Sequence, residues 1–193
     1  IDLSSLALVA GALSLGIGFG LQNIVSNFVS GLILLAERPF KVGDWIVAGN
    51  TEGIVKKISV RATEIETFQK QTVILPNSEL INAAVGNWTH RNRLGRVDVA
   101  ISVAYNSDPV AVQQILLEIA RANPYVLKTP EPFVLFKGFG IASLDFDIRV
   151  HLADITQSPL VQNDIRFTVI RRFKEEGIET PYPKTDAHVA RLA

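Results

Sequence analysis

The sequence predicts a membrane-spanning helix, a small β-barrel and a ferredoxin-like α+β domain, in that order along 193 residues. Three observations lead to this prediction. Residues 3–36 contain no charged side chain, a run long enough for a transmembrane helix. Short strand-like runs separated by glycine, asparagine and proline then continue to about residue 89, which is typical of an SH3-like or Sm-like barrel. Beyond residue 91 the pattern follows the split order βαββαβ.

Small residues form two columns on the first helix. At about 100° per residue, positions four apart fall in the same column; the columns are Ala10, Ser14 and Gly18, and Ala12, Gly16 and Gly20. A helix with two smooth flanks can be approached closely on both sides, as identical helices are in a ring. The apolar column between the flanks, with Leu15 and Phe19, would then face the ring axis. Ordinary packing of a helix pair explains the same glycines and stays open as an alternative.

The apolar run is too long for one straight span. A helix over residues 3–36 would reach about 51 Å at about 1.5 Å per residue, whereas the hydrocarbon core is about 30 Å thick. Polarity changes at Gln22 and Asn23, so we expect a bend there. Residues 24–36 are amphipathic and should lie near the membrane interface. Arg38 and Lys41 are the first basic residues, which favours a cytoplasmic location for the domains beyond the helix.

The remaining elements are predicted from the periodicity of the apolar residues. Barrel strands are expected at residues 45–47, 53–60, 62–68 and 72–75. In the α+β region we expect strands at 97–104, 133–139, 144–152 and near Ile178, and helices at 109–122 and 160–176. The predicted domains are therefore 1–37, 38–90 and 91–183, with a C-terminal strand within 184–193.

Composition argues against several other classes of protein. The 19 basic and 19 acidic residues balance, so no strong field recruits nucleic acid. The chain has no cysteine, and its three histidines lack paired ligand spacing, so neither a metal site nor a cofactor is expected. The carboxylates are scattered, which disfavours an enzyme. The chain begins with Ile1 and contains no methionine, so we expect that it starts within a longer protein with further membrane helices upstream.

Several motifs occur together in a fixed order. They are LGIGFGLQNIVSNFVSGLILLAERPFKVGDWI, Gly53, ILPNSELI at 74–81, NWTHR at 87–91, VAYNSD at 103–108 and GIETPYP at 177–183. Together they resemble the small-conductance mechanosensitive channel (MscS) family, and the similarity extends over nearly the whole chain.

The resemblance implies a homoheptameric channel in the bacterial inner membrane with its C-terminal domains in the cytoplasm. Such a channel opens under tension carried by lipid and releases small ions and solutes on hypoosmotic shock. The family's two hydrophobic gate rings correspond to Leu15 and Phe19, and its kink residues to Gln22, Asn23 and Gly31, the last being a second glycine in the lower helix. Phe19 stands where many members have leucine, and Asn23 where the best-known pattern has glycine.

Two other functions remain open from the residues alone. The α+β domain could sense a ligand while the apolar helix only anchors it to the membrane. The chain could also be a transporter subunit with substrate gating.

Overall fold

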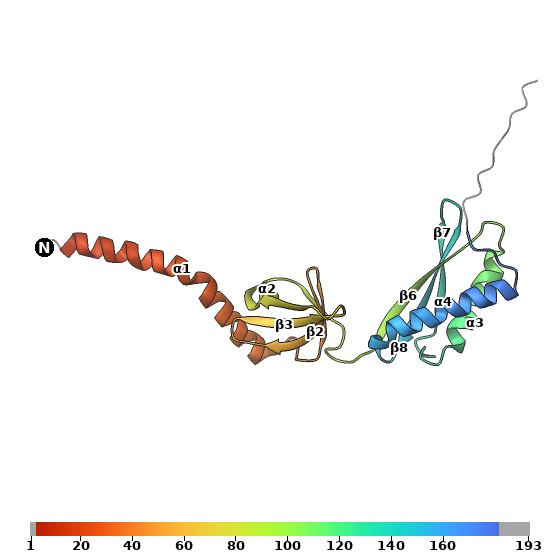
Figure 1. Cartoon of the computed structure of the whole chain (residues 1–193), viewed down its shortest axis with the longest axis horizontal. Coiled ribbons are helices and arrows are strands. Elements are labelled where there is room, and N and C mark those ends of the chain that lie inside the picture. Colours follow the sequence, from red (N-terminus) through yellow and green to blue (C-terminus); the bar gives the residue numbers. More distant parts are fainter. Residues whose placement is uncertain (1–2, 182–193) are drawn as a thin grey trace, which may run out of the picture. The chain divides into compact units, whose positions relative to one another are not determined.

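A computed structural model describes residues 3–181, with side chains from residue 7 onward. The chain divides into two compact units between Asn92 and Arg93. The first unit contains the long helix together with the barrel region, and the second contains the α+β region (Figure 1). The C-terminal strand expected within residues 184–193 lies outside the described residues.

The first unit begins with helix α1, Leu3–Glu37. The helix is continuous through Gln22 and Asn23, although its ribbon changes direction part-way along (Figure 1). It ends where Arg38 takes a left-handed conformation with φ of 52°. The amide of Arg38 still donates to the carbonyl of Leu34 at 3.0 Å, and Pro39, which cannot donate, comes next.

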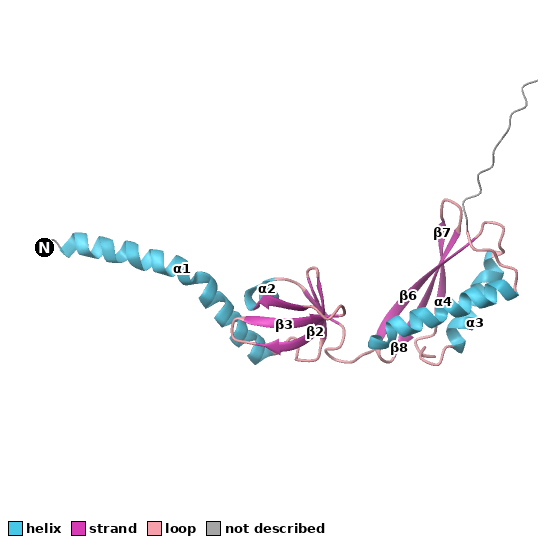
Figure 2. Cartoon of the chain, in the orientation of Figure 1, coloured by secondary structure: helices cyan, strands magenta, loops and turns pink. Residues whose placement is uncertain are grey.

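Five strands and a short helix complete this unit (Figure 2). They are β1 (Trp45–Ala48), β2 (Thr51–Ile58), β3 (Ala62–Thr67), β4 (Thr72–Pro76), α2 (Asn77–Asn82) and β5 (Val85–Asn87). The strands pair antiparallel in the order β4-β3-β2-β1-β5. The four strands expected from the sequence are confirmed to within about two residues at each end, whereas α2 and β5 were not expected because both are too short to show a period.

The predicted closure into a barrel is not seen. Among the described residues β4 and β5 are the two edges of the sheet, with no pairing between them. Helix α2 lies between these strands in the chain. Because the sheet is not closed, we refer to residues 38–92 as the β domain and not as a barrel.

The end of α1 belongs to the core of the β domain. Leu34 has no exposed surface and lies in one cluster with residues of the loop, the strands and α2, namely Phe40, Ile46, Ala48, Val55, Ile65 and Leu80. Burying a leucine side chain contributes roughly 1.5–3 kcal/mol. The last turns of the helix are thus part of the same folded unit as the strands.

The second unit is a three-stranded sheet with two helices against it. Its elements are β6 (Gly95–Val103), α3 (Pro109–Ala122), β7 (Phe133–Phe139), β8 (Leu144–Leu152), a short 3-10 turn (Ile155–Gln157) and α4 (Ser158–Glu175). The strands pair antiparallel in the order β6-β8-β7. Helix α3, β7 and β8 agree with the predicted ranges. Asp108 caps α3 by accepting from the amide of Val110 at 2.9 Å.

Alternation along the central strand β8 explains the packing of this unit. Phe146, Ile148 and Val150 point to one side and are buried. The helices bury their own apolar stripes, Val112, Leu116 and Ile119 from α3 and Val161, Ile165, Val169 and Phe173 from α4. The side chains at alternate positions of β8 are Asp145, Asp147, Arg149 and His151, so this strand presents polar side chains to the opposite face of the sheet.

The prediction of a strand near Ile178 is wrong. Gly177 turns the chain after α4 with φ of 68°, and the amide of Ala104 then donates to the carbonyl of Glu179 at 3.0 Å. The segment around Ile178 therefore runs beside the end of β6, where the last strand of a βαββαβ fold belongs. This single hydrogen bond is too little to define a strand paired with β6.

Candidate functional site

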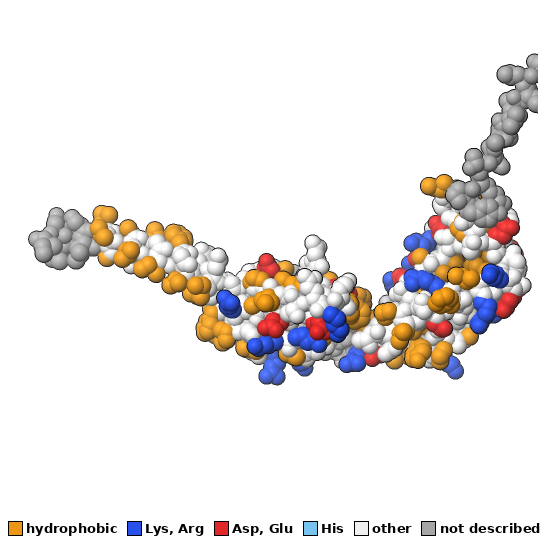
Figure 3. Space-filling view, viewed as in Figure 1, with side chains coloured by type: hydrophobic (Ala, Val, Ile, Leu, Met, Phe, Trp, Pro, Cys, Tyr) orange, Lys and Arg blue, Asp and Glu red, His pale blue; other side chains and the backbone are white. Residues whose placement is uncertain are grey.

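The first half of α1 is an apolar helix without a partner among the described residues. Ala7–Glu37 has the length and composition to cross a membrane, with a mean hydropathy of 1.6. Leu15 and Phe19, the predicted gate residues, are 62% and 69% exposed. Figure 3 shows apolar side chains along this helix and charged side chains only over the folded domains. So much apolar surface is stable in a bilayer or against other apolar helices, but not in water.

Both small-residue flanks of this half are open. A Cβ atom built on Gly16, Gly18 or Gly20 would meet no heavy atom within 4 Å in the described chain. Ala10, Ala12 and Ser14, which complete the columns, are exposed as well. The flanks are free to receive neighbouring helices at close distance, and which helices these are stays a prediction.

Gly31 lies in a very different environment. A Cβ at this position would be 2.1 Å from the carbonyl oxygen of Val60 and 2.6 Å from Nδ2 of Asn77. These are impossible distances, so only glycine lets α1 approach the loop before β3 this closely. Ser30, its neighbour, is buried too. Gly31 therefore acts in the structure as a contact point inside a continuous helix, and its predicted part in a kink is untested.

Asn77 forms the other side of this contact. Its side chain is fully buried and makes three hydrogen bonds. Thr63 Oγ1 donates to Asn77 Oδ1 at 2.9 Å, while Asn77 Nδ2 donates to the carbonyls of Ser59 at 2.9 Å and Val60 at 3.1 Å. A buried carboxamide with its hydrogen bonds satisfied fixes the loop at the position that Gly31 touches.

Asn27 links the helix to α2. Its Oδ1 accepts from the amide of Ser78 at 3.0 Å, and its Nδ2 donates to the carbonyl of Asn23 one turn earlier at 2.8 Å. The polar face of the lower helix, expected from the sequence only as the water-facing side of an interfacial helix, is thus a docking face for the β domain. The apolar face stays about half exposed at Val25, Phe28, Val29, Leu32 and Leu35.

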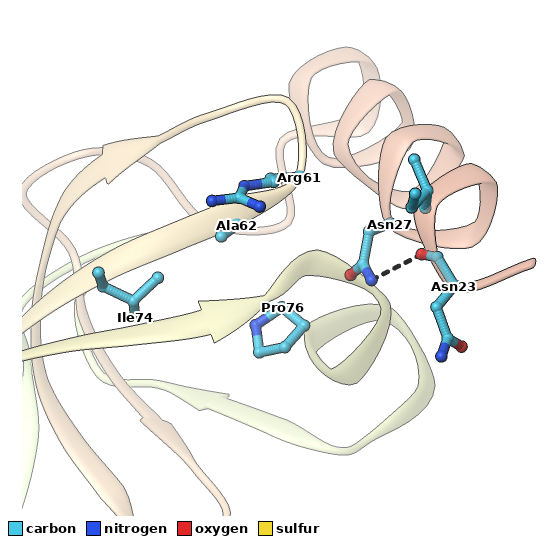
Figure 4. A pocket seen from close by; sticks show the side chains of 7 residues that line it. Asn23, Asn27, Arg61, Ala62, Ile74 and Pro76 are labelled. Atoms are coloured by element: carbon cyan, nitrogen blue, oxygen red, sulfur yellow. Dashed lines mark hydrogen bonds between the residues drawn. The ribbon is translucent and has the colours of Figure 1, made fainter. Parts of the chain in front are cut away.

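An open pocket of about 410 Å³ lies beside this contact (Figure 4). Asn23, Ile24 and Asn27 line it from α1, and Arg61, Ala62, Ile74 and Pro76 line it from the β domain. Figure 4 shows the Asn27 side chain between the helix and the strands, with its bond to Asn23. Arg61 supplies the one charge of the lining.

The outer face of the β domain carries surface ion pairs. Lys70 Nζ lies 2.9 Å and Lys56 Nζ 3.2 Å from Glu66 Oε1. The hydrogen bonds from Lys70 and then Lys56 hold the pKa of Glu66 below its ordinary value. Such exposed pairs contribute little to stability. Among the described residues no group of three or more histidine, aspartate or glutamate side chains could hold a metal.

Two family models match the chain. The mechanosensitive ion channel β-domain model covers residues 23–90, and the model of the C-terminal region of the mechanosensitive ion channel MscS covers residues 97–180. The chain belongs to the MscS family. The β-domain model of the family begins at residue 23, inside α1, which agrees with the docking of the lower helix on the β domain.

Relatives in the MscS family include much longer proteins. An uncharacterised MscS family protein of Haemophilus influenzae is 36% identical over 186 residues, which is 96% of this chain and 17% of that protein. The mechanosensitive channel MscK of Escherichia coli is 35% identical over 181 residues, which is 94% of this chain and 16% of that protein. The chain thus spans about a sixth of the length of these two relatives.

A solved MscS structure shares the fold. The Helicobacter pylori MscS crystal structure in its closed state matches with a TM-score of 0.92 at 23% identity, over 100% of this chain and 76% of that chain. This likeness supports the β domain and the C-terminal domain as the architecture of the MscS family.

Proposed function

We propose that this chain forms the pore and the cytoplasmic part of a homoheptameric channel that opens under membrane tension. The observation that carries the proposal is the exposed apolar half of α1 with its two open flanks, in a chain of the MscS family. The channel would lie in a bacterial inner membrane as a multi-pass protein and release small ions and solutes on hypoosmotic shock. Its partners are copies of itself and membrane lipid.

The proposed gate is hydrophobic. Rings of Leu15 and Phe19 side chains around the axis cannot replace the water around an ion, so a narrow ring dewets and stops conduction. If the open ring occupies more membrane area, tension lowers its free energy by the tension multiplied by that area difference. Tension can shift the equilibrium between the closed and the open ring only because it changes their free energies by different amounts.

The docking of the lower helix defines which part of α1 can move. Gly31, Leu34 and Asn27 hold it to the β domain, whereas the half that carries the gate makes no such contact among the described residues. If the gate moves relative to the β domain, α1 must bend between its gate-bearing half and its docked lower half. Gln22 and Asn23 lie there, and we propose them as the hinge.

The proposal is tested by single-channel recording on the full-length protein in reconstituted patches. Suction should produce unitary current steps that disappear when suction is released. A ligand-sensing module anchored by α1 would give no current, and a transporter subunit would give no unitary steps.

Gly16→Leu should raise the tension needed for opening or prevent assembly. A leucine on the flank separates helices that otherwise meet at backbone distance. Ile17→Leu is the control, because Ile17 is also exposed in the single chain but lies in the column that faces away from the proposed axis, so thresholds and assembly should stay normal. The opening tension is measured in patches and assembly by native mass spectrometry. Normal assembly and normal thresholds in Gly16→Leu would show that this flank meets no neighbour.

Asn23→Ala should alter channel closing or inactivation more than conductance. Alanine favours a straight helix by roughly half a kcal/mol, and the substitution removes a side chain able to bond backbone groups freed at a bend. The bond from Asn27 is retained, since it uses the carbonyl of residue 23. Closing rates and inactivation under sustained suction are the readouts. Unchanged kinetics would place the hinge elsewhere.

A further inference from the structure

Large apolar side chains are exposed together around the turn between β7 and β8. In the described chain Phe139 is 75% exposed, Tyr105 50% and Phe136 38%, and Ile141 in the turn itself is fully exposed. The rings of Tyr105 and Phe139 are stacked with their centroids 6.3 Å apart, and the Phe136 ring meets Phe139 at 5.4 Å. We refer to Tyr105, Phe136 and Phe139 as the aromatic cluster. A contiguous exposed apolar patch of this kind is typical of an interaction surface.

Hydrogen bonds hold the aromatic cluster and the turn in place. The Tyr105 hydroxyl donates to the carbonyl of Gly140 at 2.6 Å, and the amide of Gly140 donates to the carbonyl of Ser143 at 2.7 Å. Asp145 Oδ1 accepts from the hydroxyls of Ser102 and Ser143, each at 2.8 Å. The cluster is thus a preformed surface, and a partner that packs on it does not need to order it first.

The chain that follows α4 begins to pair with β6, but its sequence does not allow the pairing to continue. The amide of Ala104 donates to the carbonyl of Glu179 at 3.0 Å. In an antiparallel pair every second residue directs its backbone groups toward the partner strand, so positions 181 and 183 would be the next to bond β6. Both are prolines, which have no amide hydrogen to donate. Prolines at these two positions disfavour a strand along the edge of β6.

Tyr182, between the two prolines, is within reach of the aromatic cluster. It lies outside the described residues, but three peptide units separate it from Glu179, and these span at most about 11 Å. Glu179 is bonded to Ala104, the residue directly before Tyr105. Tyr182 is also the first aromatic residue after α4. The flanking prolines restrict the backbone of this segment, so less conformational entropy is lost when it packs against a surface.

We propose that Tyr182 packs on the aromatic cluster of its own chain and anchors the C-terminal segment to the second unit. An aromatic ring suits this surface, because aromatic pairs stabilise each other beyond the apolar area that they bury. The tyrosine hydroxyl can stay in contact with water while the ring covers Phe139. The contact fixes the point from which residues 184–193 leave the unit. It lies within one chain and does not depend on the proposed channel activity.

Disulfide formation in the full-length protein, freed of any cysteine outside these 193 residues, tests this contact. The 193 residues contain no cysteine, so Phe139→Cys with Tyr182→Cys introduces a defined pair. Mild oxidation should link the pair within one chain, so that the band stays monomeric and both thiols stop reacting with a maleimide. Ile101→Cys with Tyr182→Cys is the matched control, because a strand continued from Glu179 along β6 would place Tyr182 opposite Ile101. The Phe139 pair should form its disulfide faster than the Ile101 pair.

Hydrogen exchange gives a second readout that needs no cysteine. Tyr182→Ala uncovers the aromatic cluster, so amides of the β7–β8 turn such as that of Gly140 should exchange up to about tenfold faster. Tyr182→Phe should keep the protection of the parent protein, because the ring and not the hydroxyl makes the contact. Both variants are compared with the parent protein by mass spectrometry of peptides that cover residues 136–143.

Three results would overturn the proposal. Faster disulfide formation by the Ile101 pair would mean that the chain follows the edge of β6. Dimers or larger species from the Phe139 pair would mean that Tyr182 of one copy reaches the cluster of another. Unchanged exchange of the turn in Tyr182→Ala would show that this residue does not cover the cluster, whatever the cysteine variants do.

Discussion

Phe19→Ser and Leu15→Ser are expected to give a channel that conducts without applied tension. Serine replaces an apolar side chain by a hydroxyl that binds water, and in a ring every subunit contributes one. The dry constriction then becomes wet, and the closed state loses its barrier to ions. A change of about 1.4 kcal/mol in the balance of closed and open states already alters their ratio tenfold. We expect current at rest and a lower opening tension in patches.

The opposite side of the same helix provides the control. Leu13 is 64% exposed in the single chain, nearly the same as Leu15 at 62%, but it lies in the column that faces away from the proposed axis. Leu13→Ser should leave the resting channel closed. Equal leak from Leu13→Ser and Leu15→Ser would mean that the columns are assigned to the wrong directions, and unchanged thresholds in both gate variants would remove them from the gate.

Gly31→Ala is expected to detach the lower half of α1 from the β domain. Alanine is normally the better helix former by about 1 kcal/mol, so propensity alone predicts a more stable protein. The methyl group, however, would lie 2.1 Å from the Val60 carbonyl, a backbone atom that the fold holds in place. Overpacking of this kind costs roughly 1–3 kcal/mol, and separation of the helix would also expose Leu34. We expect a lower melting temperature in detergent and gating no longer coupled to the β domain.

Two further variants make this result specific. Gly11→Ala, where no atom lies within 4 Å of the new methyl group, should not lower the melting temperature. Adding Asn77→Ala to Gly31→Ala removes the second clash, with Nδ2 of Asn77, but not the first, so it should not restore stability. A Gly31→Ala protein as stable as the parent would show that the helix does not approach Val60 this closely.

Local patterns explain the part of the fold that was predictable. Helix α3 was placed to the residue because Asp108 and Pro109 mark its start and an apolar stripe runs to its end. Strands β7 and β8 were also placed to the residue, because each is a continuous run with a clear apolar pattern. Helix α2, β5 and the segment around Ile178 were not placed correctly, because in segments of a few residues neighbouring elements decide the conformation.

The candidate site also has one part that local sequence patterns predict and another part that they do not. Leu15, Phe19 and the small-residue columns are predicted by a helix of known period, and their exposure in the single chain agrees with a surface that neighbouring helices can cover. The roles of Gly31 and Asn27 in docking could not be read from the sequence. Ser30 and Gly31 are a small pair that could have pointed to a close contact, but nothing nearby in the chain identifies Val60 and Asn77 as the other side.

The sequence by itself determined that a long apolar helix precedes two domains of different period, since length, charge and periodicity are properties of neighbouring residues. Only the tertiary structure decided which face of that helix is held and which is free. The Asn27–Ser78 hydrogen bond joins residues 51 positions apart, and the Gly31 contact depends on a loop shaped by the buried Asn77. Such contacts are set by the packing of distant segments at backbone distance, which no local pattern encodes.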